Sequence, residues 1–296
     1  MKLEMVWRIL PRRIREKISE SDLEQVQEIR LRCGQPVGLK KAEGGLQVLE
    51  ERITASDIRE TVSLLSAYSL YAFEEELRQG YLTIEGGHRV GFCGKVVLEK
   101  GEIRTLKQIN ALNIRIAREQ KGWSEGFLTD LMEGRRFYHT LIISPPGCGK
   151  TTLLRDLIRC LSDGQKMVGV VDERGEIAPL RDGVPQMDVG MCTDVLEGCP
   201  KAAGMLMLLR SMGPEIIAVD EIGKKEDVEA IQEVLHCGVK LVATAHGYDF
   251  VDICQRLGGL TDVFERYLIL SNRKGTGTLE AILDKEGKII RKGDKE

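Results

Sequence analysis

The sequence of 296 residues is poor in aromatic side chains and has no long apolar run. Phe, Trp and Tyr make up 5% of the chain, which is little for a platform on which the bases of single-stranded nucleic acid stack. No stretch approaches the ~18 apolar residues of a membrane span, and the N-terminus lacks a signal-peptide core. We therefore expect a cytoplasmic protein that binds no nucleic acid and does not insert into a membrane.

Neither sign of charge dominates, and the cysteines follow no metal-binding pattern. The chain carries 43 basic and 46 acidic side chains, a net charge of −3, which is untypical of a protein that coats nucleic acid. The eight cysteines include no C-x-x-C pair and none at zinc-finger spacing from a histidine. Their scatter is typical of small thiols in a reducing cytosol.

A glycine-rich turn between an apolar strand and a helix is the strongest signal in the chain. It matches a phosphate loop, with a serine in place of the usual first glycine. Such a turn points backbone N–H groups at an anion. Lys150 is expected to reach the β- and γ-phosphates of ATP, and Thr151 to ligate Mg²⁺. The residues expected to border the nucleotide are Ser144, Pro145, Pro146, Gly147, Cys148, Gly149, Lys150, Thr151 and Thr152.

Residues 1–120 predict a small α+β domain. Helical apolar spacing is found over 7–18 and again over 58–71, after a start signal at 54–57. Strands are predicted over 26–32, 80–84, 89–98 and 113–117. The segment 121–126, which contains two glycines, is predicted to join this domain to the next.

Residues 127–296 alternate between strands and helices. Strands are predicted over 140–143, 167–171, 215–220 and 239–244, and helices over 150–161, 201–212 and 226–236. The strands are almost continuously apolar, which indicates a parallel sheet covered on both faces. With the phosphate loop, this predicts an α/β fold, a RecA-like ATPase domain. The charged tail from residue 284 onward is expected to fray.

Carboxylates follow two of the predicted strands. Asp220 ends one of them and is expected to hold Mg²⁺ through its water shell. Glu221 is placed to polarise the attacking water as a general base; the alternative is a surface carboxylate pair. Glu173, after the strand 167–171, either contacts the water or Mg²⁺ or belongs to an ion-pair cluster around Arg174.

The strand 239–244 delivers two more polar side chains to the edge of the sheet where open α/β sheets bind ligands. Thr244 and His246 are each able to sense the γ-phosphate by a hydrogen bond. The alternative for His246 is a loop histidine without a role in the reaction.

Together these elements resemble the ATPases of type II and type IV secretion systems. The run 208–223 is similar to their Walker B region, and 238–246 to their histidine box; Asp220 stands where many of them carry glycine. The resemblance implies catalytic roles for Glu221, Lys150, His246 and Glu173.

The first 120 residues narrow the resemblance. The blocks 28–32, 80–84, 86–94 and 112–119 resemble the stage III sporulation protein AA family. This implies an ATP-hydrolysing motor of the mother cell, peripheral at its membrane, which works as a ring, usually a hexamer. Its implied partners are membrane-embedded components of a channel between mother cell and forespore.

Two questions stay open at this level. Arg89, Arg115 and Arg118 are candidates for reaching a nucleotide on a neighbouring subunit, or they form ion pairs within their own domain. The phosphate-loop core is also compatible with an AAA-type or helicase-like translocase acting on nucleic acid, with a small-molecule kinase, or with a nucleotide-gated scaffold. Charge balance and the scarcity of aromatic residues argue against the translocase.

Overall fold

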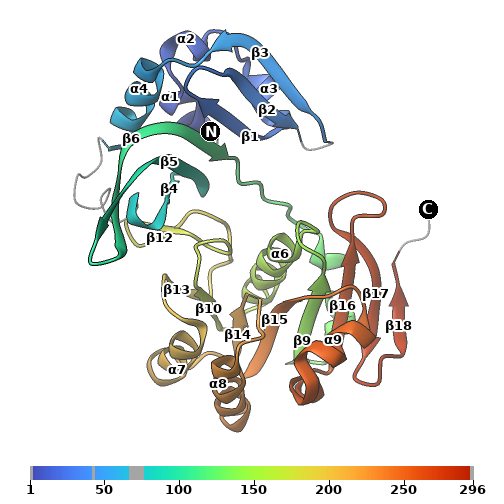
Figure 1. Ribbon diagram of the computed structural model, residues 1–296. Helices are drawn as coiled ribbons and strands as arrows, with labels where there is room; N and C mark the ends of the chain where they lie inside the picture. The colour runs from blue at the N-terminus through green and yellow to red at the C-terminus, as the bar shows by residue number, and fades with distance from the viewer. Residues whose placement is uncertain (1–2, 42–43, 67–76, 294–296) are drawn as a thin grey trace. The chain divides into compact units, whose positions relative to one another are not determined.

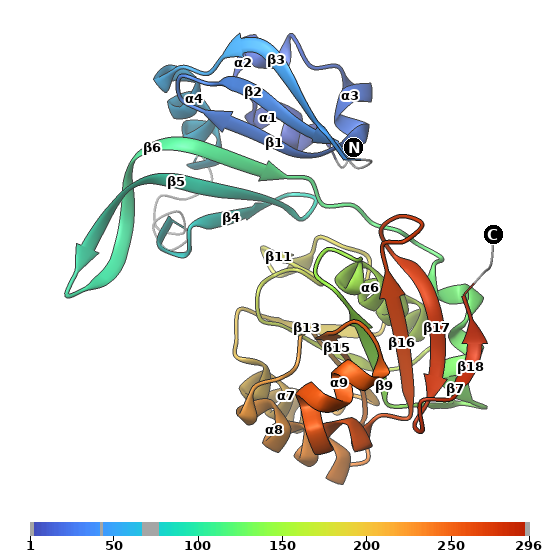
Figure 2. The same ribbon diagram turned by 45° about the vertical axis from the view of Figure 1, so that its right-hand side comes forward.

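A computed structural model describes residues 3–41, 44–66 and 77–293, and the chain divides into two compact units (Figures 1 and 2). The first unit is Met1–Arg118 and the second is Glu119–Glu296. Each contains a sheet and a core of its own. The segment 121–126, which the sequence predicts to be a joint, lies near the start of the second unit.

The first unit is built on an antiparallel sheet of six strands in the order β3-β2-β1-β6-β5-β4. The strands are β1 (Val26–Arg32), β2 (Pro36–Lys41), β3 (Leu46–Arg52), β4 (Tyr81–Ile84), β5 (His88–Glu99) and β6 (Glu102–Arg115). The helices are α1 (Glu4–Ile9), α2 (Arg12–Arg15), α3 (Glu20–Gln25) and α4 (Ala55–Ser66). Their apolar residues share one core. The predicted α+β character and the strand over 26–32 are confirmed.

Two predictions for this unit need correction, and one helix start is confirmed. The single helix expected over 7–18 is two short helices, because Pro11 lacks an N–H group and stands at the N-cap of α2. The helix start predicted at 54–57 is confirmed, because α4 begins at Ala55 and Thr54 and Asp57 cap each other; the last five residues of the apolar spacing over 58–71 lie outside the described part. The strand expected over 113–117 is the end of the much longer β6.

The second unit has a sheet of eight strands in the order β13-β10-β14-β15-β9-β16-β17-β18. The strands are β9 (Thr140–Ser144), β10 (Val168–Asp172), β13 (Thr193–Glu197), β14 (Ile216–Val219), β15 (Lys240–His246), β16 (Arg266–Ser271), β17 (Thr278–Asp284) and β18 (Ile289–Lys292). Pairing from β13 to β16 is parallel, as expected, whereas β17 and β18 are antiparallel. The tail predicted to fray is therefore a strand over Ile289–Lys292.

Alternate residues of the parallel strands bury opposite faces of this sheet. Ile142 packs in the core that holds α6 (Lys150–Asp163). Its neighbour Ile143 packs in the other core, with α7 (Lys201–Ser211), α8 (Lys225–His236) and α9 (Phe250–Leu257). Figure 1 shows this layering of helices on both faces. The carboxyl ends of β9, β14 and β15 meet at one edge, which positions the candidate site.

Short elements complete the second unit. They are the 3-10 turns η1 (Ser124–Gly126), η2 (Leu128–Leu131) and η3 (Gly258–Val263), and the two-stranded pairs β7 (Met132–Glu133) with β8 (Arg136–Phe137) and β11 (Leu180–Arg181) with β12 (Val184–Pro185). Across the described residues, no helix combines the length and apolar character needed to cross a membrane.

Candidate nucleotide site

The phosphate loop joins β9 to α6, as the sequence predicts. Gly147 and Gly149 have φ angles of 75° and 84°, a region that glycine adopts without the strain of a side chain. Gly149 is the N-cap of α6, so the helix begins at Lys150 and its first N–H groups have no partner within the helix. Thr151 and Thr152 lie in this first turn, half-buried. The loop therefore has the geometry of an anion site.

The residue in place of the usual first glycine faces Lys150. Ser144 is fully buried, and its hydroxyl donates to the Pro145 carbonyl at 2.8 Å. The Nζ of Lys150 lies 3.5 Å from the same hydroxyl oxygen. Cys148 is also buried, whereas Pro146 is exposed. Ser144 thus helps to enclose the lysine.

Lys150 is held at the base of the loop and is only 6% exposed. Its ammonium donates to the carbonyls of Ser144 and Pro145 at 3.2 and 3.3 Å, and lies 3.0 Å from Nδ1 of His246. Burial lowers the pKa of Lys150. Because an ammonium only donates, Nδ1 of His246 accepts, and the proton of the neutral ring is on Nε2.

The Nε2–H group of His246 points at the carboxylate of Glu221, which follows β14. Nε2 of His246 lies 2.8 Å from Oε1 of Glu221. The backbone N–H of Glu221 donates to the Thr244 hydroxyl at 2.6 Å, so Thr244 fastens β14 to β15. The structure brings Lys150, His246 and Glu221 into one hydrogen-bonded chain.

Asp220 lies deeper than Glu221 and is 5% exposed. Its burial raises its pKa to about 6, although the nearby Lys201 opposes this shift. The Nζ of Lys201 is 3.5 Å from Oδ1 of Asp220, and this buried oxygen has no hydrogen-bond partner. A buried carboxylate oxygen left in this way is suited to a cation or to a water bound to one.

The donors at this position fit Mg²⁺. Oxygen atoms of carboxylates and hydroxyls are its preferred ligands, and Mg²⁺ usually keeps several waters and takes phosphate oxygens as well. Within the described residues, no group of three or more His, Cys, Asp or Glu side chains forms a metal site. Thr151 and Asp220 carry oxygen donors of the kind that would hold the ion together with the triphosphate.

Glu173, after β10, has two lysine partners. One carboxylate oxygen pairs with Lys201 and the other lies 3.6 Å from Nζ of Lys224. Hydrogen bonding to Lys201 is the main cause of its lowered pKa. The contact of Glu173 with water or Mg²⁺ stays a prediction. The structure shows that Lys201 lies between the carboxylates of Glu173 and Asp220 and pairs with both.

Sequence reasoning missed Lys201, which is 6% exposed. The residue is the first of α7 and follows Pro200. A lysine at the start of a helix is ordinarily solvated, so neither spacing nor composition signals that this one lies between two carboxylates. Only the packing of α7 against β10, observed in the structure, places it there.

The three arginine candidates all belong to the first unit. Arg89 stacks on the ring of Tyr81, with Cζ 3.4 Å from the ring centre. Arg118 donates to the carbonyls of Leu23 and Val26 at 3.3 and 2.9 Å. Arg115, opposite Arg89 in the β5–β6 register, is exposed.

Comparison with known sequences identifies relatives along the whole chain. The family model described as "Sporulation stage III, protein AA" matches residues 1–290. Stage III sporulation protein AA of Bacillus subtilis (strain 168) is 45% identical over 294 residues, which is 95% of each chain. The protein SEEDLING PLASTID DEVELOPMENT 1 of Arabidopsis thaliana is 28% identical over 89% of this chain and 37% of its own length.

Solved structures share the fold. The ATPase DotB of Legionella pneumophila matches with a TM-score of 0.58 at 18% identity, over 88% of this chain and 76% of DotB. The pilus retraction motor PilT, solved with bound ADP, matches with a TM-score of 0.54 at 15% identity, over 84% of this chain and 76% of PilT. The predicted RecA-like phosphate-loop ATPase fold, with a smaller domain before it, is confirmed.

Proposed function

The chain belongs to the sporulation stage III, protein AA family, and from this premise we propose that it is an ATPase that hydrolyses ATP to ADP and phosphate. The observation that carries the proposal is the chain of contacts from Lys150 through His246 to Glu221. It joins the phosphate loop to a carboxylate that is 37% exposed and so is accessible to water. The fold shared with DotB and PilT supports the same reading.

Binding would begin at the loop. The N–H groups at the start of α6 cradle the phosphates, and Lys150 exchanges the carbonyls of Ser144 and Pro145 for phosphate oxygens. This exchange is favourable because a buried ammonium gains charged partners in place of neutral ones. Bound Mg²⁺ would supply neutralisation of phosphate charge, with Thr151 and Asp220 holding it.

Glu221 would then act as the general base. A water molecule between Glu221 and the γ-phosphorus loses its proton to the carboxylate as its oxygen attacks, and the bond to the β-γ bridging oxygen breaks to release ADP. His246 orients Glu221 through its Nε2–H group. Glu173 would act through Lys201, which keeps the carboxylates of Glu173 and Asp220 together.

We further propose that the chain works as a ring, a hexamer by analogy with the family, in which an arginine of one subunit reaches the nucleotide of the next. Arg115 is the best candidate of the three, because Arg89 stacks on Tyr81 and Arg118, although exposed like Arg115, donates to backbone carbonyls. Family membership supports a place in the mother cell, on the cytoplasmic side of its membrane, where membrane-embedded channel components would be the partners.

The proposed function is tested by measuring phosphate release with and without Mg²⁺. Glu221→Gln removes the base and keeps the shape, so it should still bind ATP and lose at least ~10²-fold in turnover. The matched control is Glu226→Gln, which changes an exposed carboxylate at the start of α8. Turnover that Glu221→Gln leaves unchanged would remove Glu221 from this role. Stimulation by single-stranded DNA would instead favour the translocase.

A further inference from the structure

Trp123 lies against the phosphate loop. A Cβ atom added to Gly149 would be 3.5 Å from Cη2 of Trp123, and one added to Gly277 would be 2.7 Å from the same atom. The tip of the indole ring thus touches the N-cap of α6 and the turn between β16 and β17. Trp123 as a whole residue is half-buried, and it packs against the apolar core that includes α6.

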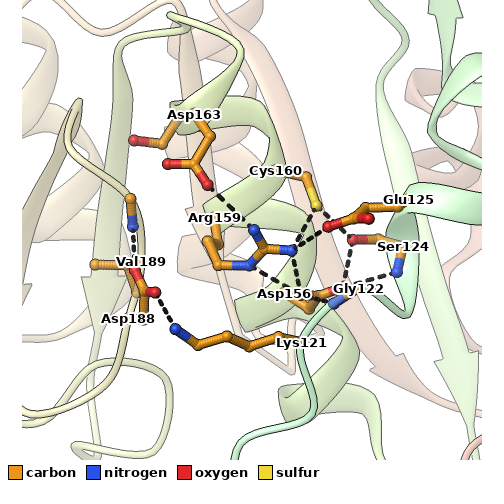
Figure 3. A network of polar contacts seen from close by, with 12 residues as sticks. Lys121, Gly122, Ser124, Glu125, Asp156, Arg159, Cys160, Asp163, Asp188 and Val189 are labelled. Carbon is orange, nitrogen blue, oxygen red and sulfur yellow. Dashed lines mark hydrogen bonds and ion pairs between the residues drawn. The ribbon is translucent and has the colours of Figure 1, made fainter.

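A network of polar contacts fixes the segment that carries this ring (Figure 3). Asp156, two turns into α6, accepts the N–H groups of Gly122 and Ser124 at 3.0 and 2.7 Å, and also the Ser124 hydroxyl at 2.7 Å. Arg159 pairs with both Asp156 and Glu125. The backbone on either side of Trp123 is therefore tied to the helix that begins at the loop.

Lys121 extends this attachment by its ion pair with Asp188, which Figure 3 also shows. Next to it is a hollow lined by Lys121, Thr152 and Arg155, among others. This hollow runs along the side of α6 from Thr152 to Arg159, and Trp123 is not among the residues that line it. Segment 121–124 is therefore attached to the helix that begins at the phosphate loop, although its composition predicts a simple joint.

The sheet order gives the direction in which a bound nucleotide would run. The order is β14-β15-β9-β16-β17, with the loop after β9. Lys150 contacts His246 of β15, which contacts Glu221 after β14, so the γ-phosphate end faces the β14–β15 side. The opposite end of the nucleotide must leave the loop on the β16–β17 side, where Trp123 meets Gly277.

We propose that Trp123 is the residue on which the base of ATP rests, with the turn before β17 as the neighbouring wall. The inference rests on the proposed function, since it assumes that the loop binds a nucleoside triphosphate. The indole beside the loop offers a flat apolar surface for the π-face of a base. Asp156 acts as a positioning residue because it holds the two residues that flank the tryptophan.

The first test uses the ring as its own reporter. The chain has two tryptophans, Trp7 and Trp123, and Trp7→Phe leaves Trp123 as the only one. ATP and ADP should change its emission, whereas inorganic tripolyphosphate, which lacks a base, should bind with little change. ATP binding seen by calorimetry without any change in emission would overturn the inference, as would an equal response to tripolyphosphate. Trp123→Phe is the matched control and should show no response.

The second test separates base from phosphate by affinity. Trp123→Ala should raise the Kd for ATP about tenfold or more and leave the Kd for tripolyphosphate unchanged, and Trp123→Phe should recover most of the loss. An equal loss of affinity for ATP and for tripolyphosphate would indicate that Trp123 has a structural role and would contradict the inference. If the wild-type chain binds neither ligand, the proposed function fails as well. If it binds both and Trp123→Ala loses nothing, only the role of Trp123 fails.

Discussion

Nζ of Lys150 lies 3.0 Å from Nδ1 of His246, and this contact joins the phosphate loop to the neighbouring strand β15. This contact also determines which nitrogen of the His246 ring carries the proton, because the Lys150 ammonium can only donate hydrogen bonds. Nε2 is then the donor to Glu221. A change at the loop that moves Lys150 would be transmitted through His246 to the carboxylate.

His246→Ala should therefore reduce turnover more than binding. We expect kcat to fall ~10²-fold, because Glu221 loses the group that orients it, while the KM for ATP changes little. The measurement is steady-state hydrolysis at saturating Mg²⁺. His236→Ala, an exposed histidine at the end of α8, should behave as wild type; equal activity of the two variants would contradict the role of His246.

Asp220→Asn should raise the Mg²⁺ concentration that hydrolysis requires. The buried Oδ1 without a hydrogen-bond partner is the atom suited to the ion or its water shell, and the amide carries no charge to attract them. We expect the Mg²⁺ concentration for half-maximal hydrolysis to rise ~10-fold or more. A magnesium titration with an unchanged midpoint would place the ion elsewhere.

Lys201→Met should destabilise the fold. The substitution leaves Glu173 and Asp220 without their shared cation, and Asp220 is almost fully buried. Removing one partner of a buried ion pair costs about 3 kcal/mol of unfolding free energy. Urea unfolding measures it, with Lys225→Met, an exposed residue of α8, as the control. Equal midpoints for the two variants would show that the pairing of Lys201 contributes little.

His139 should make stability depend on pH. Its Nδ1 accepts the Leu241 N–H at 3.1 Å, and Nε2 lies 3.1 Å from Nζ of Lys240. Burial, and then the Lys240 charge, lower its pKa from 6.5 to about 4. The unfolded chain binds this proton more readily, so stability present above pH 6.5 is lost as the pH falls toward 4.

The check is urea unfolding of wild type and His139→Gln at pH 7 and pH 5. Because Gln does not titrate, the variant should lose less stability between the two values than the wild type. The same loss in both proteins would mean that other groups account for the pH dependence.

Ring formation is measured by light scattering with a non-hydrolysable ATP analogue. We expect a mass of about six chains, by the family analogy, for wild type and for Arg115→Ala, with turnover lost in the variant if its guanidinium acts across the subunit boundary. A monomer at every concentration, with or without the analogue, would contradict the ring.

Local patterns predicted much of the second unit. The apolar run of β9, the glycine-rich loop and the carboxylates after β14 each carry their signal within a few residues. Edge strands carry a weaker local signal. Because β13 is half-buried along its whole length, its sequence shows neither an apolar run nor a clear alternation of apolar and polar residues. The pairing of Lys201 and the position of Trp123 depend on residues distant in sequence. The break at Pro11, by contrast, follows from the sequence alone, because proline has no N–H group.

A single-turnover experiment shows most directly whether the loop holds ATP while Glu221 activates water. Excess protein is mixed with labelled ATP and Mg²⁺, quenched with acid over time, and assayed for ADP. We expect the wild-type chain to convert the bound ATP to ADP and the Glu221→Gln variant to retain it as intact ATP. Conversion by Glu221→Gln at the wild-type rate, or no binding by either protein, would contradict this expectation.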